Sequence, residues 1–248
     1  MKRAIWLASV SLLAQPGADP VSLQKERGMG KQLAAEVRKR SQPFDEPQVA
    51  GYVERTGRAL LAALPNPRLE YQFEVISSDS GSEPFALPGG FVFVPARAFL
   101  VARDESEFAG LLAHAIGHAE LRHGAQVGSR GQIPLVFTGG PNGRHAETQN
   151  PQLALPLGML ASQRTFELEA DRFAVDLAAR AGYDPAGLQR YIARVQVDDP
   201  KFSALPERDL RLVRMREVLE SQPRASAVSR SGEEFEEIRE IVRRVIGR

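Results

Sequence analysis

Two histidines, His114 and His118, stand four residues apart in the 248-residue chain. An α-helix has 3.6 residues per turn, so both imidazole rings would leave the same face and could share one metal ion. A pair at this spacing also arises by chance, and two ordinary surface or core histidines are then an equal alternative. The pair indicates a metal site but does not establish one.

Two acids, Glu167 and Asp171, have the same spacing on a later predicted helix. Both border an apolar stripe, where an unpaired charge is costly, so each needs a partner. Salt bridges on the helix surface, with Arg164 or Arg172, are the alternative to a metal site. Two histidines and one carboxylate form the ligand set of a catalytic zinc ion that keeps one position open for water.

Composition removes several other classes of protein. The chain has no cysteine, which excludes disulfide scaffolds, zinc–thiolate fingers, iron–sulfur sites and cysteine nucleophiles. The formal charge is 32 − 31 = +1 and no basic block is present, so we expect no nucleic-acid binding. The length suits a single globular domain.

The N-terminus has the pattern of a secretion signal. Lys2 and Arg3 precede an apolar run of about eleven residues, which is too short to span a bilayer. An amphipathic first helix is the alternative, but the run has no charged face. We therefore expect a signal peptide over residues 1–18, a single domain over residues 19–248 without a membrane span, and export to the periplasm or out of the cell.

The histidines and acids must be positioned by two helices. The first is predicted over residues 104–123, with a capping box formed by Asp104 and Glu107 and with Gly124 at its C-terminal end. The second is predicted over residues 162–181. The Gly/Pro-rich segment 125–160 between them is long enough to be an active-site cover or disordered, and His145 within it is expected to be solvated.

The remaining pattern predicts an α+β fold, mostly helical with a small sheet. Residues 69–75 alternate as a strand with one buried face. Residues 85–94 form a second extended segment, which Pro88 should place at a sheet edge because proline has no N–H to donate. The other predicted helices cover residues 22–40, 45–64, 185–197, 206–221 and a C-terminal segment from residue 231.

Four segments, in this order, resemble the HtpX/BepA-like zinc metallopeptidases, metallopeptidase family forty-eight. They are the helix of residues 112–123, Phe85-Ala86-Leu87-Pro88-Gly89-Gly90, Glu167 to Arg172, and Ala181 to Pro185. The resemblance implies a zincin-type domain with Zn²⁺ on His114, His118 and Glu167. It implies that Asp171 orients the site, and that the protein cuts unfolded or misassembled envelope proteins.

The chain departs from that family at the position of the general base. The family pattern is H-E-x-x-H, in which the glutamate takes a proton from the attacking water, and here the position is Ala115. Glu120 leaves the helix on the far side and cannot replace it. The family's Asn-Ala before the edge strand is Glu83-Pro84, and the His-Pro of its exported members is Leu205-Pro206. Loss of proton transfer should cost on the order of 10²–10⁴ in rate.

Other residues receive simpler interpretations. His123 lies about 140° around the helix from His118 and is expected to cap the helix C-terminus rather than bind metal. Glu169 should face water. An extended substrate could pair with the edge strand formed by Phe85, Ala86, Leu87, Gly89 and Gly90, which would explain broad sequence tolerance.

Two hypotheses follow. The first is a zinc metalloendopeptidase of the cell envelope, with polypeptide substrates and envelope protein partners, disabled by a natural or deliberate Ala115. The second is a zinc-stabilised, chaperone-like module that binds extended polypeptide without cleavage. A third, metal-free arrangement of salt-bridged side chains is less favoured.

Overall fold

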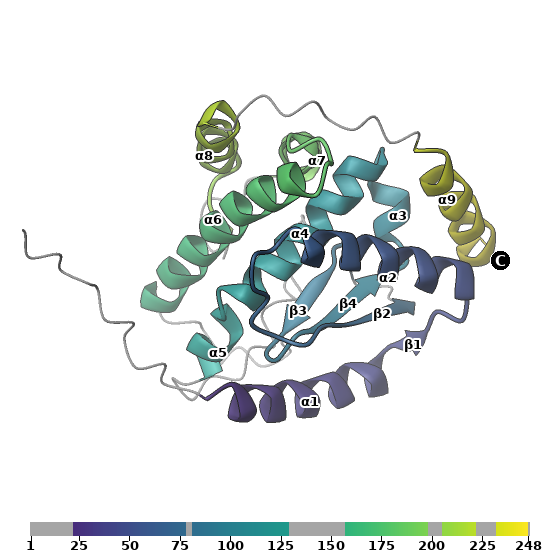
Figure 1. Cartoon of the computed structure of the whole chain (residues 1–248), viewed down its shortest axis with the longest axis horizontal. Coiled ribbons are helices and arrows are strands. Elements are labelled where there is room, and N and C mark those ends of the chain that lie inside the picture. The colour runs from purple at the N-terminus through teal and green to yellow at the C-terminus, as the bar shows by residue number, and fades with distance from the viewer. Residues whose placement is uncertain (1–21, 78–80, 129–156, 198–204, 222–231, 248) are drawn as a thin grey trace, which may run out of the picture.

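Helices surround a small sheet in the computed structural model of the chain (Figure 1). The structure describes residues 22–77, 81–128, 157–197, 205–221 and 232–247. The helices within these ranges are α1 Leu23–Arg40, α2 Pro47–Ala62, α3 Ala98–Val101, α4 Glu105–Glu120, α5 His123–Gly128, α6 Leu157–Arg180, α7 Gly187–Val195, α8 Arg208–Ser221 and α9 Glu233–Ile246.

The sheet has four strands in the order β1-β2-β4-β3, which makes β3 an edge strand. The central strands β2 and β4 are parallel, whereas β1 and β3 pair antiparallel with their neighbours. The helices and this mixed sheet agree with the predicted α+β class. The strands are β1 Gln42–Pro43, β2 Gln72–Ser77, β3 Phe85–Leu87 and β4 Phe91–Pro95.

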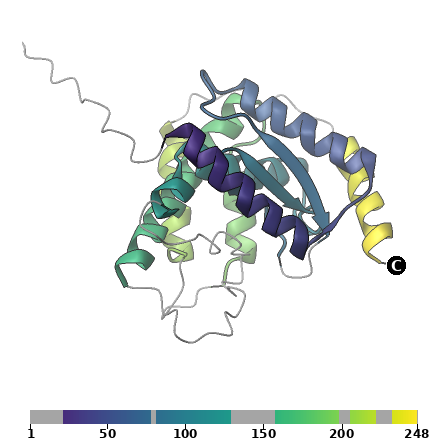
Figure 2. The ribbon, with the colours of Figure 1, turned by 90° about the horizontal axis from the view of Figure 1, so that it is seen from below.

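Both faces of β4 are buried, because successive side chains of a strand point to opposite faces. Phe91 and Phe93 pack with Ala34 of α1, which lies across one face of the sheet (Figure 2). Val92 and Val94 face the larger core formed with α2 and α4. The sheet is therefore a layer between α1 and the helices that carry the candidate site.

The segment 85–94 is a hairpin rather than one extended edge segment. Strands β3 and β4 pair antiparallel around Pro88-Gly89-Gly90. Gly89 and Gly90 have φ angles of 80° and 89°, which favour glycine. Pro88 thus lies in the turn, where its lack of a backbone N–H breaks no hydrogen bond between strands. Strand β4 is a central strand of the sheet. The prediction of an edge strand is correct for β3 only.

Helices α4 and α6 pack closely against each other. Asp104 caps α4 by accepting a hydrogen bond from the Glu107 backbone N–H at 2.8 Å. Gly117 permits the close approach of the two helices, because a Cβ atom there would lie 3.1 Å from the Phe173 ring of α6. This contact brings the acids of α6 within reach of the histidines of α4.

The end of α4 differs from the prediction. The helix stops at Glu120, and Arg122, with a φ of 57°, turns the chain before α5 begins at His123. Gly124, predicted as the terminal glycine, lies inside α5. The left-handed backbone conformation of Arg122 is unfavourable for a residue with a side chain, and a buried ion pair offsets this cost. In that pair Arg122 Nε donates to Glu26 Oε2 at 2.6 Å.

Several predictions fall on residues outside the described ranges. These are the signal peptide, most of the segment 125–160 and His145 within it. Among the helices that the structure describes, none combines the length and hydrophobicity needed to cross a membrane.

Candidate metal centre

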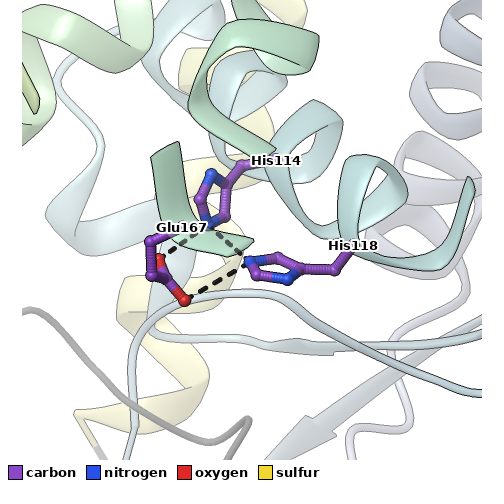
Figure 3. A group of neighbouring side chains, drawn as sticks. All are labelled: His114, His118 and Glu167. Carbon is purple, nitrogen blue, oxygen red and sulfur yellow. Dashed lines mark hydrogen bonds and ion pairs between the residues drawn. The ribbon is translucent and has the colours of Figure 1, made fainter. Parts of the chain in front are cut away.

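The two histidines of α4 and Glu167 of α6 point toward one another (Figure 3). His114 Nε2 and His118 Nε2 are 3.1 Å apart. The Glu167 carboxylate lies 3.3 Å from the first ring nitrogen and 3.4 Å from the second. Each residue offers one ligand atom, all within 4.8 Å of one another, so the structure brings the three predicted donors together.

These separations fit a small metal ion. Bonds of about 2.0–2.1 Å from a tetrahedral metal place neighbouring ligand atoms about 3.3–3.4 Å apart. The two imidazole nitrogens are 3.1 Å apart, and each lies near this distance from one oxygen of the Glu167 carboxylate, His114 3.3 Å from Oε2 and His118 3.4 Å from Oε1. Two imidazole nitrogens and one carboxylate therefore suit a tetrahedral metal ion whose fourth position remains open.

A charged pair stands behind His114. Asp171 of α6 is fully buried, and its Oδ1 lies 3.1 Å from His114 Nδ1. Arg211 of α8 donates two hydrogen bonds to the same carboxylate, each 2.7 Å long. The acid therefore borders the ligand, as the sequence predicts, but its partner is Arg211 rather than Arg164 or Arg172. No local spacing could reveal a residue forty positions away.

A second histidine stands behind His118. His123 Nδ1 lies 3.0 Å from His118 Nδ1, and its Nε2 lies 3.0 Å from Glu169 Oε2. The His123 ring is fully buried and stacks on Phe166, with the ring centroids 4.3 Å apart. The predicted role of His123 as a helix cap is wrong, because α4 ends before it and its ring nitrogens contact His118 and Glu169 instead.

The two α4 histidines have opposite electrostatic environments. Burial alone would lower the pKa of His114, but contacts with Asp171 and Glu167 outweigh burial and raise it to about 9. Burial lowers the pKa of His118 to about 4, and the neighbouring His114 opposes its protonation further. The Glu167 pKa is held below its usual range because the surrounding cations outweigh the effect of burial.

The position of the family's base holds only a methyl group. Ala115 is 1% exposed and belongs to the apolar core. Glu120 does not replace the base, as its position in the sequence predicts. It accepts a hydrogen bond from the Tyr71 hydroxyl at 2.8 Å and contacts the Arg68 backbone N–H. Its carboxylate is therefore engaged beside β2, away from the histidines.

Sequence reasoning missed Glu83 as a site residue. It lies just before β3, and its carboxyl interacts electrostatically with Arg211 and His114. Burial raises the pKa of Glu83 to about 7 against the opposing effect of these two cations. The signal in the sequence is the acid itself, which stands where the family has Asn before the edge strand.

The edge strand borders the centre. Phe85, Ala86 and Leu87 form β3, which contacts α4, and Gly89 and Gly90 form the turn after it. Strand β3 pairs with β4 on one side, and no other strand of the described residues pairs with its second side. The unpaired edge of a sheet can in general pair with a further extended segment.

Comparison with known proteins agrees with this arrangement. The model of peptidase family M48 matches residues 47–230, about three quarters of the chain. The chain belongs to peptidase family M48. Its membership of the HtpX/BepA-like metallopeptidases and its zincin-type α+β fold, both predicted from the sequence, are thereby confirmed.

The chain is similar to several curated proteins over part of their length. The beta-barrel assembly-enhancing protease of Escherichia coli (strain K12) is 24% identical over 198 residues, or 75% of this chain and 40% of that protein. The protein of the same name from Yersinia pestis is 25% identical over 199 residues, or 75% and 41%. The mitochondrial metalloendopeptidase OMA1 of Schizosaccharomyces pombe is 30% identical over 172 residues, or 66% and 50%. The chain thus spans about two fifths to one half of these relatives.

Proposed function

We propose that the chain is a zinc-binding metallopeptidase domain that holds extended polypeptide and cleaves it very slowly. The observation that carries this proposal is the buried methyl group of Ala115 beside three converging metal donors. His114, His118 and Glu167 would bind Zn²⁺, and Asp171 would orient His114. When bound, zinc would polarise the scissile carbonyl and activate the attacking water.

The donors support zinc, since two imidazoles and a carboxylate with one open position form a catalytic zinc ligand set. The free side of β3 supports an extended substrate, because main-chain hydrogen bonds to an edge strand ignore side-chain identity. Ala115 accepts no proton, so the general-base contribution to catalysis, on the order of 10²–10⁴ in rate, is lost.

The test compares the parent chain with Ala115→Glu and Ala115→Gln. Zinc content is measured first, and hydrolysis of an unfolded casein substrate is then followed for all three. We expect bound zinc in each protein and a rate increase on the order of 10²–10⁴ for Ala115→Glu only, because the amide of the matched control cannot accept a proton. Thermal melts establish that the variants fold.

Other outcomes select other functions. Zinc binding with no gain in Ala115→Glu, together with retention of unfolded casein, would favour the chaperone-like module that binds without cleavage. Absence of zinc from the parent chain would reject both readings. A Glu83→Gln variant of the parent chain tests whether the Glu83 carboxyl contributes to the slow casein hydrolysis of the parent. We expect the rate of hydrolysis to be low in the parent and in Glu83→Gln.

We also propose that the protein works in the cell envelope or outside the cell. The basic and apolar start of the chain supports export, and the E. coli relative carries barrel assembly in its name. Client polypeptides would then be unfolded or misassembled envelope proteins. Fractionation of cells that produce the full chain tests this, with the mass of the recovered protein showing whether residues 1–18 are removed.

A further inference from the structure

The contact between His118 and His123 restricts where their protons can be. Two imidazole Nδ1 atoms 3.0 Å apart form a hydrogen bond only if one carries a proton and the other does not. His118 Nε2 faces His114 and Glu167 and must offer its lone pair to bind a metal ion there. The proton of a neutral His118 ring is therefore on Nδ1, and His123 Nδ1 is the acceptor.

The same reasoning continues outward. Because His123 Nδ1 accepts, its proton is on Nε2, which lies 3.0 Å from Glu169 Oε2. A carboxylate is an acceptor and completes the sequence of hydrogen bonds without conflict. The path runs from the buried His118 to a side chain of Glu169 that is 51% exposed.

Packing and burial keep this arrangement in place. The fully buried His123 ring lies flat against Phe166, with an angle of 15° between the planes. The Arg122–Glu26 ion pair fixes the turn that delivers the ring to this position.

From these contacts we propose that His123 and Glu169 form a positioning relay, which fixes the tautomer and orientation of His118 for metal binding. The relay rests on the proposed zinc centre but concerns two residues beyond its ligands. Groups that orient a ligating histidine typically change metal affinity by 10–100-fold when they are removed. Both residues act through the His118 ring, so they are positioning residues rather than catalytic ones.

The experiment measures zinc affinity by competition with a chromogenic chelator, using zinc alone as the probe. His123→Phe keeps a flat ring against Phe166 but removes the acceptor, and should weaken zinc binding by about 10–100-fold. His123→Asn places an amide oxygen near the Nδ1 position and should recover most of that affinity. Glu169→Gln should have an effect of less than about tenfold, because its amide oxygen still accepts.

A matched control is Asp176→Asn, which changes another acid of α6 that pairs with Arg180 rather than with a histidine. It should leave zinc affinity unchanged. The second readout is nitrogen-15 NMR of the zinc-loaded parent chain, which should show the proton of His118 on Nδ1 and that of His123 on Nε2. This spectrum tests the relay even if His123→Phe does not fold.

The outcomes separate the relay from the zinc centre. A parent chain that binds no zinc rejects the proposed function. A parent chain that binds zinc, with His123→Phe binding equally tightly or with the His123 proton on Nδ1, overturns the relay alone. Loss of affinity in His123→Phe with recovery in His123→Asn supports it.

Discussion

His114 and His118 come from one helix and face the same point, yet the groups behind their rings differ in charge. An aspartate held by an arginine lies behind the first ring, and a neutral imidazole lies behind the second. The pKa values accordingly separate to about 9 and about 4. Sequence spacing makes the two positions equivalent, whereas tertiary packing makes one a cation and the other a neutral acceptor before any metal binds.

The largest expected effect concerns the charged side of this comparison. Arg211→Met should destabilise the fold by about 3–5 kcal/mol, because Asp171 is fully buried and would lose its main counterion. Urea denaturation of the metal-free proteins measures the change. The exposed pair of Arg190 with Asp184 supplies a control, since Arg190→Met should cost no more than about 1 kcal/mol.

The double variant Arg211→Met with Asp171→Asn sharpens the same comparison. It removes both charges, so it should be more stable than Arg211→Met alone. A loss below about 1 kcal/mol for Arg211→Met would show that His114 alone already compensates the charge of Asp171, and the contrast between the two sides would then be weaker than the contacts indicate.

The next effect concerns Glu83, which adds a second acid to the His114 side. Burial raises its folded-state pKa from 4.5 to about 7, so its stabilising contribution is complete below pH 4.5 and is lost as pH rises through 7. Glutamine does not titrate in this range. Between pH 4.5 and pH 8 the free energy of unfolding of metal-free Glu83→Gln should therefore rise by about 1–3 kcal/mol relative to that of the metal-free parent. Denaturation curves at both pH values measure this, and a difference independent of pH would contradict it.

The last effect, about 1.4 kcal/mol for each pH unit, is read from zinc binding itself. At pH 7 His114 carries a proton that the metal must displace, whereas His118 does not. Zinc affinity should rise about tenfold per pH unit between pH 7 and 9, with about one proton released per ion at pH 7. Titration calorimetry in buffers of different ionisation enthalpy counts the protons. Release of none, or of two, would show that the rings titrate alike.

The sequence was sufficient for features that follow a helical period. The spacing of His114 and His118, and of Glu167 and Asp171, predicted which side chains share a face, and the fold brings these four together. Periodicity could not place His123, because a single left-handed residue at Arg122 ends the period before it. It could not place Glu83 or Arg211 either, since an extended segment and a distant helix carry them to the centre.

The edge strand shows an intermediate case. Pro88 excluded the middle of a sheet and correctly indicated an interruption, but the same signal fits a turn as well as an edge. The positive φ angles of Gly89 and Gly90 decide for a hairpin, which buries β4 on both faces and leaves β3 at the edge. The residue types alone indicated that Pro88, Gly89 and Gly90 interrupt the strand, and the pairing of β3 with β4 shows that they form a turn.

Glu26 of α1 has a consequence for how the folding unit is delimited. Its carboxylate holds the Arg122 guanidinium and contacts the backbone N–H of Gly89, so one side chain ties the first helix to both the α4–α5 junction and the hairpin. The family match begins only at residue 47. A fragment that begins at residue 47 would lose the Arg122–Glu26 ion pair and would expose the face of the sheet that α1 covers. The smallest unit that folds on its own therefore starts upstream of the region matched by the family.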